Sequence, residues 1–228
     1  MPSAALARTA ACVFDAYGTL FDILSATNRC RDVLGDKAPA LGALWRTRQL
    51  EYSWLRSLMG AHADFWQVTG ESLDYAMASL EIENPALRER LMQLFRNIEA
   101  YPDARRVLEA LRRARRPAAI LSNGTPDMLK AAVGSAGIGE LLDHVLSIEE
   151  AGIYKPHRSV YELVPRRLGL PAERICFVSS NGWDAAGAAH FGFQAVWANR
   201  GGLPRERLPG TLAAEIQSLD ALPGLLGL

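Results

Sequence analysis

Short, continuous apolar runs alternate with helical patterns along most of the chain, and this alternation limits the folds available to it. The runs lie at residues 10–14, 117–121, 144–148, 174–178 and 193–197. The helical patterns among them cover residues 103–114, 126–135, 159–168 and 183–191. Continuous apolar runs are typical of strands buried on both faces, and strands that alternate with helices form parallel sheets. The order therefore predicts a doubly wound parallel α/β sheet.

One long stretch interrupts this alternation. Between residues 22 and 100 there is no convincing strand pattern, but there are four helical patterns, at residues 25–34, 40–59, 64–80 and 86–98. In the second of these, apolar side chains recur at the three- and four-residue steps of one helix face. We predict a helical cap subdomain of residues 22–100, inserted into an α/β core domain made of residues 1–21 and 101–228.

Loops rich in glycine and small polar residues follow three of the apolar runs. They read DAYGT at residues 15–19, SNGT at 122–125 and SSNGWD at 179–184. Ligands of open α/β sheets bind beyond the carboxyl ends of the strands, and such loops bring backbone amides close to an anion. Asp15 directly follows an apolar run, so its carboxylate emerges at a strand end. Taken alone, this aspartate fits a turn cap as well as a functional group.

Composition and spacing exclude several classes of function. The 25 lysines and arginines balance 25 aspartates and glutamates, which argues against nucleic-acid or membrane-surface binding by bulk electrostatics. No apolar run approaches the roughly 20 residues that a membrane helix needs. Three cysteines without a CxxC pair and four scattered histidines predict neither a disulfide framework nor a metal site. The N-terminal apolar stretch is too short and too polar for a signal peptide, so we expect a cytoplasmic protein.

Six segments of the chain resemble the L-2-haloacid dehalogenases of the haloacid dehalogenase superfamily. They are FDAYGTLFD (14–22), WRTRQLEYSWLRSLMG (45–60), YPDA (101–104), ILSNG (120–124), YKP (154–156) and FVSSNGWD (177–184). The resemblance covers nearly the whole chain and keeps the order of the family's segments. It implies a Rossmann-like core with a helical cap, a homodimer, and hydrolysis of short-chain L-2-haloalkanoic acids to D-2-hydroxy acids and halide without a cofactor.

Two positions depart from the pattern of the superfamily's phosphatases, which use Asp-x-Asp after the first strand and bind magnesium with acidic residues of the last loop. Tyr17 occupies the second position of the motif, and Ser180 stands where an acid is expected. A departing chloride or bromide needs no protonation, and a monocarboxylate needs no divalent clamp. These departures favour a dehalogenase over a magnesium-dependent phosphatase, the second hypothesis. A binding protein without catalysis is the third.

The resemblance also implies roles for individual residues. Asp15 would attack the α-carbon of the haloacid and form an ester, with inversion at that carbon. Lys155 would keep Asp15 ionised, and Arg46 would meet the departing halide. The other residues expected at the catalytic centre are Thr19, Ser122, Tyr161, Ser179, Asn181 and Asp184. Tyr161 could be partly structural, and the group that accepts the proton of the hydrolytic water stays open.

The substrate-binding residues are expected on the same loops and on the cap. Ser122 and the backbone amides of Ala16 and Tyr17 would bind the substrate carboxylate, and Asn123 would assist at the halide. An apolar wall would be formed by Tyr17, Leu50, Phe65 and Trp183. For Leu50 and Phe65 a plain core role is the alternative. The chain length and halogen of the substrate, the physiological substrate, the dimer interface and the role of His157 stay open.

Overall fold

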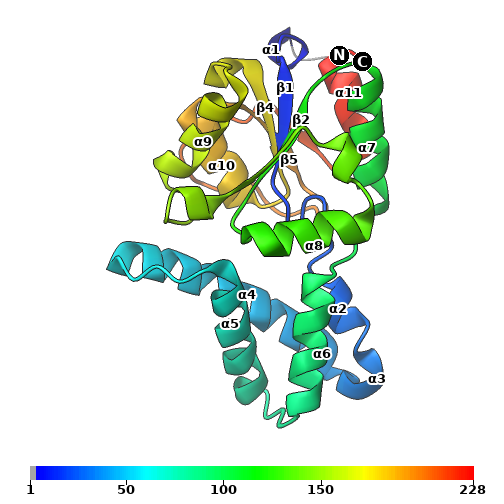
Figure 1. Cartoon of the computed structure of the whole chain (residues 1–228), viewed down its shortest axis with the longest axis vertical. Helices are drawn as coiled ribbons and strands as arrows, with labels where there is room; N and C mark the ends of the chain where they lie inside the picture. Colours follow the sequence, from blue (N-terminus) through cyan, green and yellow to red (C-terminus); the bar gives the residue numbers. More distant parts are fainter. Residues whose placement is uncertain (1–3) are drawn as a thin grey trace.

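The computed structural model of the chain describes residues 4–228 and contains a six-stranded parallel sheet (Figure 1). The strands are β1 (Ala11–Phe14), β2 (Ala118–Ser122), β3 (His144–Ser147), β4 (Ile175–Ser179), β5 (Gln194–Ala198) and β6 (Ala214–Ile216). Their order in the sheet is β3-β2-β1-β4-β5-β6, and every neighbouring pair is parallel. All residues of β1, β2 and β4 are buried, as continuous apolar runs predict. The doubly wound parallel sheet is confirmed.

Helices flank the sheet and also gather beyond one of its edges. Those of the α/β layer are α7 (Pro102–Arg113), α8 (Pro126–Ala136), α9 (Arg158–Leu168), α10 (Gly182–Phe191) and the short α1 (Ala4–Ala7) and α11 (Leu222–Leu226). In Figure 1, α9 and α10 lie on one side of the sheet, and α7 and α11 on the other. The predicted start of α8 is confirmed, because the Thr125 hydroxyl accepts the Met128 N–H at 3.2 Å before Pro126.

The remaining helices lie beyond the carboxyl edge of the sheet (Figure 1). They are α2 (Ser25–Asn28), α3 (Arg31–Leu34), α4 (Lys37–Met59), α5 (Phe65–Ser79) and α6 (Pro85–Arg96). Two segments of the chain connect these helices to the sheet layer, and backbone hydrogen bonds join the two segments. The Asp22 N–H donates to Glu99 O and the Tyr101 N–H donates to Leu20 O, both at 2.8 Å. This pairing lies at the predicted ends of the cap. The domain limits themselves (1–21 with 101–228, and 22–100) stay a prediction, and residues 1–3 lie outside the described residues.

Three details differ from the sequence-based expectation. Strand β6 was not predicted, because its three residues, with the exposed Glu215 in the middle, carry no apolar run. The helix expected at residues 25–34 is two short helices, α2 and α3. The hydroxyls of Ser25 and Thr27 donate to Asp22 O and Leu24 O, at 2.7 and 3.1 Å, and such local bonds compete with a regular helix. Helices α1 and α11 are too short to show a periodic pattern.

No helix among residues 4–228 is both long enough and apolar enough to cross a lipid bilayer.

A buried ion pair joins the end of the sheet to the start of α7. The Asp103 carboxylate, 5% exposed, accepts hydrogen bonds from both terminal nitrogens of Arg200 at 2.8 and 2.9 Å. It also accepts from the Ser218 hydroxyl at 2.8 Å and the Leu219 N–H at 2.9 Å. Burial alone would raise the pKa of Asp103, but these four donors hold it below its ordinary value. Arg200 also donates to Thr19 O at 2.9 Å, so the pair supports the loop after β1.

We expect Asp103→Asn to lower the free energy of unfolding by about 3 kcal/mol near neutral pH, because it leaves Arg200 without its counter-charge. A carboxyl with a lowered pKa in the folded state stabilises the fold above its unfolded pKa, and this contribution is lost as pH falls through the folded pKa. The difference from the wild type should therefore shrink below about pH 4. Urea unfolding near neutral pH and below about pH 4 measures this difference in the free energy of unfolding. The exposed Asp220→Asn is the matched control, and an Asp103 effect no larger than that of the control would contradict the prediction.

Candidate active site

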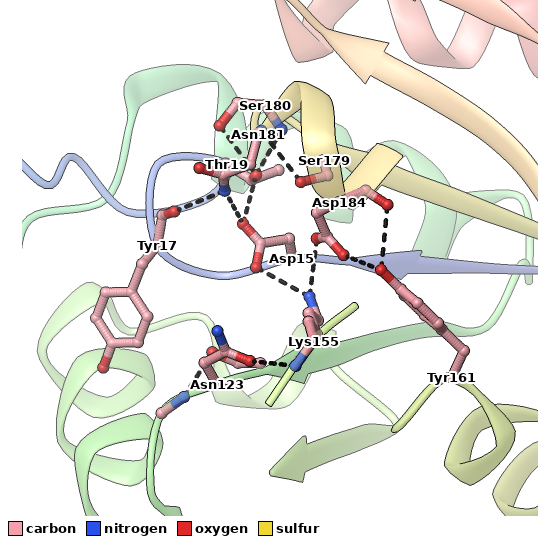
Figure 2. A network of polar contacts seen from close by, with 12 residues as sticks. Asp15, Tyr17, Thr19, Asn123, Lys155, Tyr161, Ser179, Ser180, Asn181 and Asp184 are labelled. Carbon is pink, nitrogen blue, oxygen red and sulfur yellow. Dashed lines mark hydrogen bonds and ion pairs between the residues drawn. The ribbon is translucent and has the colours of Figure 1, made fainter. Parts of the chain in front are cut away.

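Three polar loops meet where the adjacent strands β2, β1 and β4 end (Figure 2). Asp15 follows β1, Ser122 ends β2 and Ser179 ends β4. Because β1 lies between the other two strands, their carboxyl ends point the loops toward one another. The sequence-based site map placed its candidates on these loops, and the structure brings them together.

The Asp15 carboxylate is buried and held by three donors. Its Oδ1 accepts from Lys155 Nζ at 3.1 Å, and its Oδ2 accepts from the Thr19 hydroxyl and from Asn181 Nδ2, both at 2.9 Å. Only 6% of Asp15 is exposed. Hydrogen bonds from a cation and two polar groups fix the orientation of the carboxylate. Such a carboxylate is suited to act as a nucleophile.

Lys155 lies between two carboxylates. Its Nζ donates to Asp184 Oδ2 at 2.9 Å as well as to Asp15, and the Tyr161 hydroxyl donates to Asp184 Oδ1 at 2.7 Å (Figure 2). Lys155 is 1% exposed. Burial by itself would lower the pKa of Lys155, but the two carboxylates raise it above its ordinary value, so the ammonium stays charged. Burial raises the pKa of Asp184, and Lys155 opposes that rise.

Hydrogen bonds join the loop after β1 to the loop after β4. The Thr19 hydroxyl oxygen accepts the Ser180 N–H at 2.8 Å and donates its proton to Asp15 Oδ2 at 2.9 Å, the shorter of its contacts with Asp15 and with the Ser180 hydroxyl at 3.2 Å. The Ser179 hydroxyl accepts the Asn181 N–H at 3.2 Å and so fixes the turn that carries Asn181. Thr19 and Ser179 are both fully buried. Thr19 therefore contacts the Asp15 carboxylate directly, whereas Ser179 is linked to it through Asn181.

Arg46 extends from α4 to the same loops. Its Nη2 donates to Asn181 Oδ1 at 3.0 Å and to Tyr17 O at 3.4 Å, and its Nη1 donates to Gln49 Oε1 at 2.8 Å. Burial lowers the pKa of Arg46, while the Asp15 and Asp184 carboxylates raise it. A guanidinium stays protonated in proteins despite such a shift. Asn181 thus bridges a buried carboxylate and a cation supplied by a helix beyond the sheet edge.

The end of β2 and the start of the first loop carry further polar groups. Ser122 is fully buried, and its hydroxyl oxygen accepts the Gly124 N–H at 3.1 Å. Asn123 Oδ1 accepts the Lys155 N–H at 3.2 Å. Among residues 4–228 no acceptor is found for the backbone N–H groups of Ala16 and Tyr17. These two amides are therefore available to bind an anion beside Asp15.

Comparisons with known proteins identify the family of the chain. The model of the haloacid dehalogenase-like hydrolases matches residues 9–192. (S)-2-haloacid dehalogenase 4A of Burkholderia cepacia is 47% identical over 217 residues, which cover 95% of this chain and 94% of the relative. The chain belongs to the L-2-haloacid dehalogenases. The family predicted from the six sequence segments is confirmed.

Solved structures of L-2-haloacid dehalogenases have the same fold. The enzyme of Xanthobacter autotrophicus with chloropropionic acid covalently bound is 36% identical, with a TM-score of 0.87 over 96% of this chain and 98% of that chain. A dehalogenase crystallised with an intermediate complex is 46% identical, with a TM-score of 0.94 over 96% of this chain and 97% of that chain. These likenesses extend over both the sheet layer and the helices beyond its edge.

Part of the predicted apolar wall of this dehalogenase family member lies around Tyr17. Its ring stacks on Phe95 at 5.3 Å between ring centres and tilts against Phe65 at 5.8 Å. Burial raises the pKa of the Tyr17 hydroxyl, which has no hydrogen-bond partner among residues 4–228. Phe65 is 1% exposed and also packs against Tyr154. The core role considered for Phe65 is therefore present in the structure.

The other two predicted wall residues are Trp183 and Leu50. Trp183 lies in the first turn of α10 and packs edge-on against Trp54 of α4, with 5.3 Å between ring centres. Leu50 is half-buried on α4, one turn beyond Arg46. The Trp54–Trp183 contact joins α4 to the sheet layer. The roles of Leu50 and Trp183 toward a substrate stay predictions.

Sequence reasoning missed two supports of the site. Gln49 accepts a hydrogen bond from Arg46, and Arg200 donates to Thr19 O. Signals for both exist: Gln49 lies three residues after Arg46 on one helix, a spacing at which side chains meet. Arg200 lies just beyond β5, at the same carboxyl edge as the other loops. Among residues 4–228 no group of three histidine, cysteine or acidic side chains is placed to hold a metal.

Proposed function

We propose that the chain hydrolyses the carbon–halogen bond of short-chain L-2-haloalkanoic acids and releases D-2-hydroxy acids. The observation that carries this proposal is the buried Asp15 carboxylate, held by Lys155, Thr19 and Asn181, with the Arg46 guanidinium on the other side of Asn181. The relatives named (S)-2-haloacid dehalogenase and the Xanthobacter enzyme that binds chloropropionic acid covalently support the same substrate class. A homodimer, expected from the family resemblance, stays a proposal.

In the first step, a carboxylate oxygen of Asp15 attacks C2 of the substrate from the side opposite the halogen. The new O–C bond forms while the C–halogen bond breaks, and its electron pair leaves with the halide. Backside displacement inverts the configuration at C2. Ser122 and the amides of Ala16 and Tyr17 would bind the substrate carboxylate. Arg46 and Asn123 would stabilise the negative charge that develops on the halogen.

In the second step, water attacks the carbonyl carbon of the Asp15 ester. The tetrahedral intermediate collapses by breaking the bond between that carbon and the alkyl oxygen, which keeps the electron pair. One proton of the water goes to this oxygen and completes the hydroxy acid, the other proton leaves the site, and the Asp15 carboxylate is restored. No bond to C2 changes in this step, so the inversion of the first step is kept. Asp184 holds the Lys155 ammonium, with its own orientation set by Tyr161, and would help to orient the water.

The Lys155 ammonium and the Arg46 guanidinium balance the charges of Asp15 and Asp184 from within the chain. Lys155 lies within hydrogen-bonding distance of both carboxylates, and Tyr17 occupies the position of the phosphatase general acid. The magnesium-dependent phosphatase hypothesis therefore has no observation in its favour. A binding protein without catalysis has none either, because the polar groups around Asp15 form one connected network.

We expect chloride release from L-2-chloropropionate and not from its D-isomer, undiminished by EDTA, with D-lactate as the product. Chloride measurement and chiral chromatography check this. A mass increase on the Asp15 peptide during turnover would identify the ester. Release from neither isomer, or strict dependence on magnesium, would contradict the proposed function, and turnover of an aryl phosphate would restore the phosphatase hypothesis.

A further inference from the structure

The Arg46 guanidinium is held between two side-chain amides, one from each side. Nη1 donates to Gln49 Oε1 at 2.8 Å on its own helix, and Nη2 donates to Asn181 Oδ1 at 3.0 Å on the loop after β4. Asn181 was expected at the site, whereas Gln49 was not. Gln49 is only 1% exposed, although glutamine side chains in proteins are mostly exposed to solvent.

A hydrogen-bond relay on α5 determines which end of the Gln49 amide faces Arg46. The Thr69 hydroxyl, fully buried, donates its one proton to Phe65 O at 2.6 Å. Its oxygen can then only accept from Gln49, which donates through Nε2 at 2.7 Å. With its NH₂ group bound to Thr69, Gln49 presents its oxygen to Arg46. The number of available protons therefore determines which end of the Gln49 amide is the oxygen and which is the nitrogen.

The same count identifies the free donors of Arg46. A guanidinium has five N–H groups in a fixed plane. The two on Nη2 go to Asn181 Oδ1 and Tyr17 O, and one on Nη1 goes to Gln49. Among residues 4–228, the second Nη1 proton and the Nε proton have no hydrogen-bond acceptor. The bond to Gln49 thus fixes the rotation of the plane and decides where the remaining donors point.

We propose that Gln49 is a positioning residue that aims the free N–H groups of Arg46 at the departing halide, with Thr69 locking its amide. This inference rests on the proposed function, in which Arg46 meets the halide. A neutral amide oxygen fits that task better than a carboxylate, because it orients the guanidinium without neutralising the charge that attracts the halide. Gln49 itself touches no reacting atom in this proposal.

The test compares Gln49→Met, which keeps the side-chain length but removes the acceptor, with Gln49→Glu, which keeps an acceptor and adds a charge. Halide release is measured within the first turnover, so that slow ester hydrolysis does not mask it. We expect Gln49→Met to slow chloride release about 10- to 100-fold, with a smaller loss for L-2-bromopropionate, because bromide is the better leaving group. KM should change less than about threefold, since the substrate carboxylate binds elsewhere.

Gln49→Glu should weaken bromide binding, measured by calorimetry, about tenfold or more, because its charge cancels that of Arg46. Thr69→Val removes the lock at nearly constant volume and should reproduce part of the Gln49→Met loss. Gln67→Met on the exposed side of α5 is the matched control and should leave every value unchanged.

Equal losses for both halogens, together with unchanged bromide binding in the Gln49 variants, would overturn the positioning role. If Gln49→Met does not fold, the same two measurements, first-turnover halide release and bromide binding, are made on Thr69→Val and Gln49→Glu and decide the positioning role. A wild-type protein that binds bromide but releases no halide from the substrate would refute the proposed function. It would leave the positioning role of Gln49 open to test, because bromide binding in the variants still reports whether Gln49 orients Arg46.

Discussion

Asp15→Asn should lower the first-turnover release of chloride from L-2-chloropropionate by at least about 10⁴-fold, the scale of loss seen when a catalytic nucleophile is removed. An amide oxygen carries no negative charge and cannot form the ester by displacing the halide. The substitution keeps the size of the side chain, and its one acceptor oxygen still serves the donors on one side of Asp15, while Lys155 keeps Asp184 as its counter-charge. The fold should therefore survive while the chemistry stops.

Asp127→Asn, in the exposed first turn of α8, is the matched control and should retain wild-type rates. Thermal unfolding and circular dichroism of both variants show whether the loss has a structural origin. A folded Asp15→Asn protein that keeps more than about 1% of the wild-type rate would remove Asp15 as the nucleophile.

The sheet could be predicted because burial on both faces leaves a direct mark in the sequence. All four residues of β1 and the first four of β4 are apolar, and such continuous runs are typical of strands in parallel sheets. Strand β6 lies at the sheet edge and has the exposed Glu215 at its centre, so it has no continuous apolar run. The break between α2 and α3 arises from hydroxyl groups that hydrogen-bond to the backbone. The spacing of apolar residues in the sequence contains no information about such bonds.

The candidate site was predictable to the level of loops but not of contacts. The rule that loops after parallel strands converge places Asp15 near the loop of Asp184 without any distance. The contact between Lys155 and Asp15 joins residues 140 positions apart, and only the folded chain determines it. Gln49 was missed because its role depends on Thr69 of the neighbouring helix, so that spacing within α4 alone does not distinguish it from a solvated side chain.

Replacement of Lys155 should show that its charge, and not only its volume, serves the reaction. Its Nζ lies 3.1 Å from Asp15 Oδ1 and 2.9 Å from Asp184 Oδ2. Lys155→Met keeps most of the side-chain volume but leaves two buried carboxylates facing each other. Like charges in a buried site raise the pKa of the pair, so one proton is retained near neutral pH. We expect chloride release to fall about 10³-fold near pH 7.

The pH profile separates loss of charge from loss of shape. In the wild type the two carboxylates raise the pKa of Lys155, so the ammonium persists and the first-turnover rate should stay nearly flat between about pH 6 and 9. In Lys155→Met the residual rate should rise with pH, by up to about tenfold per unit, as the shared proton leaves and Asp15 regains its nucleophilic form. Lys130→Met, on the exposed side of α8, should match the wild type. A loss in Lys155→Met that is the same at every pH would mean that Lys155 orients Asp15 without controlling its ionisation. A rate that is limited by a proton on the carboxylates would instead rise with pH.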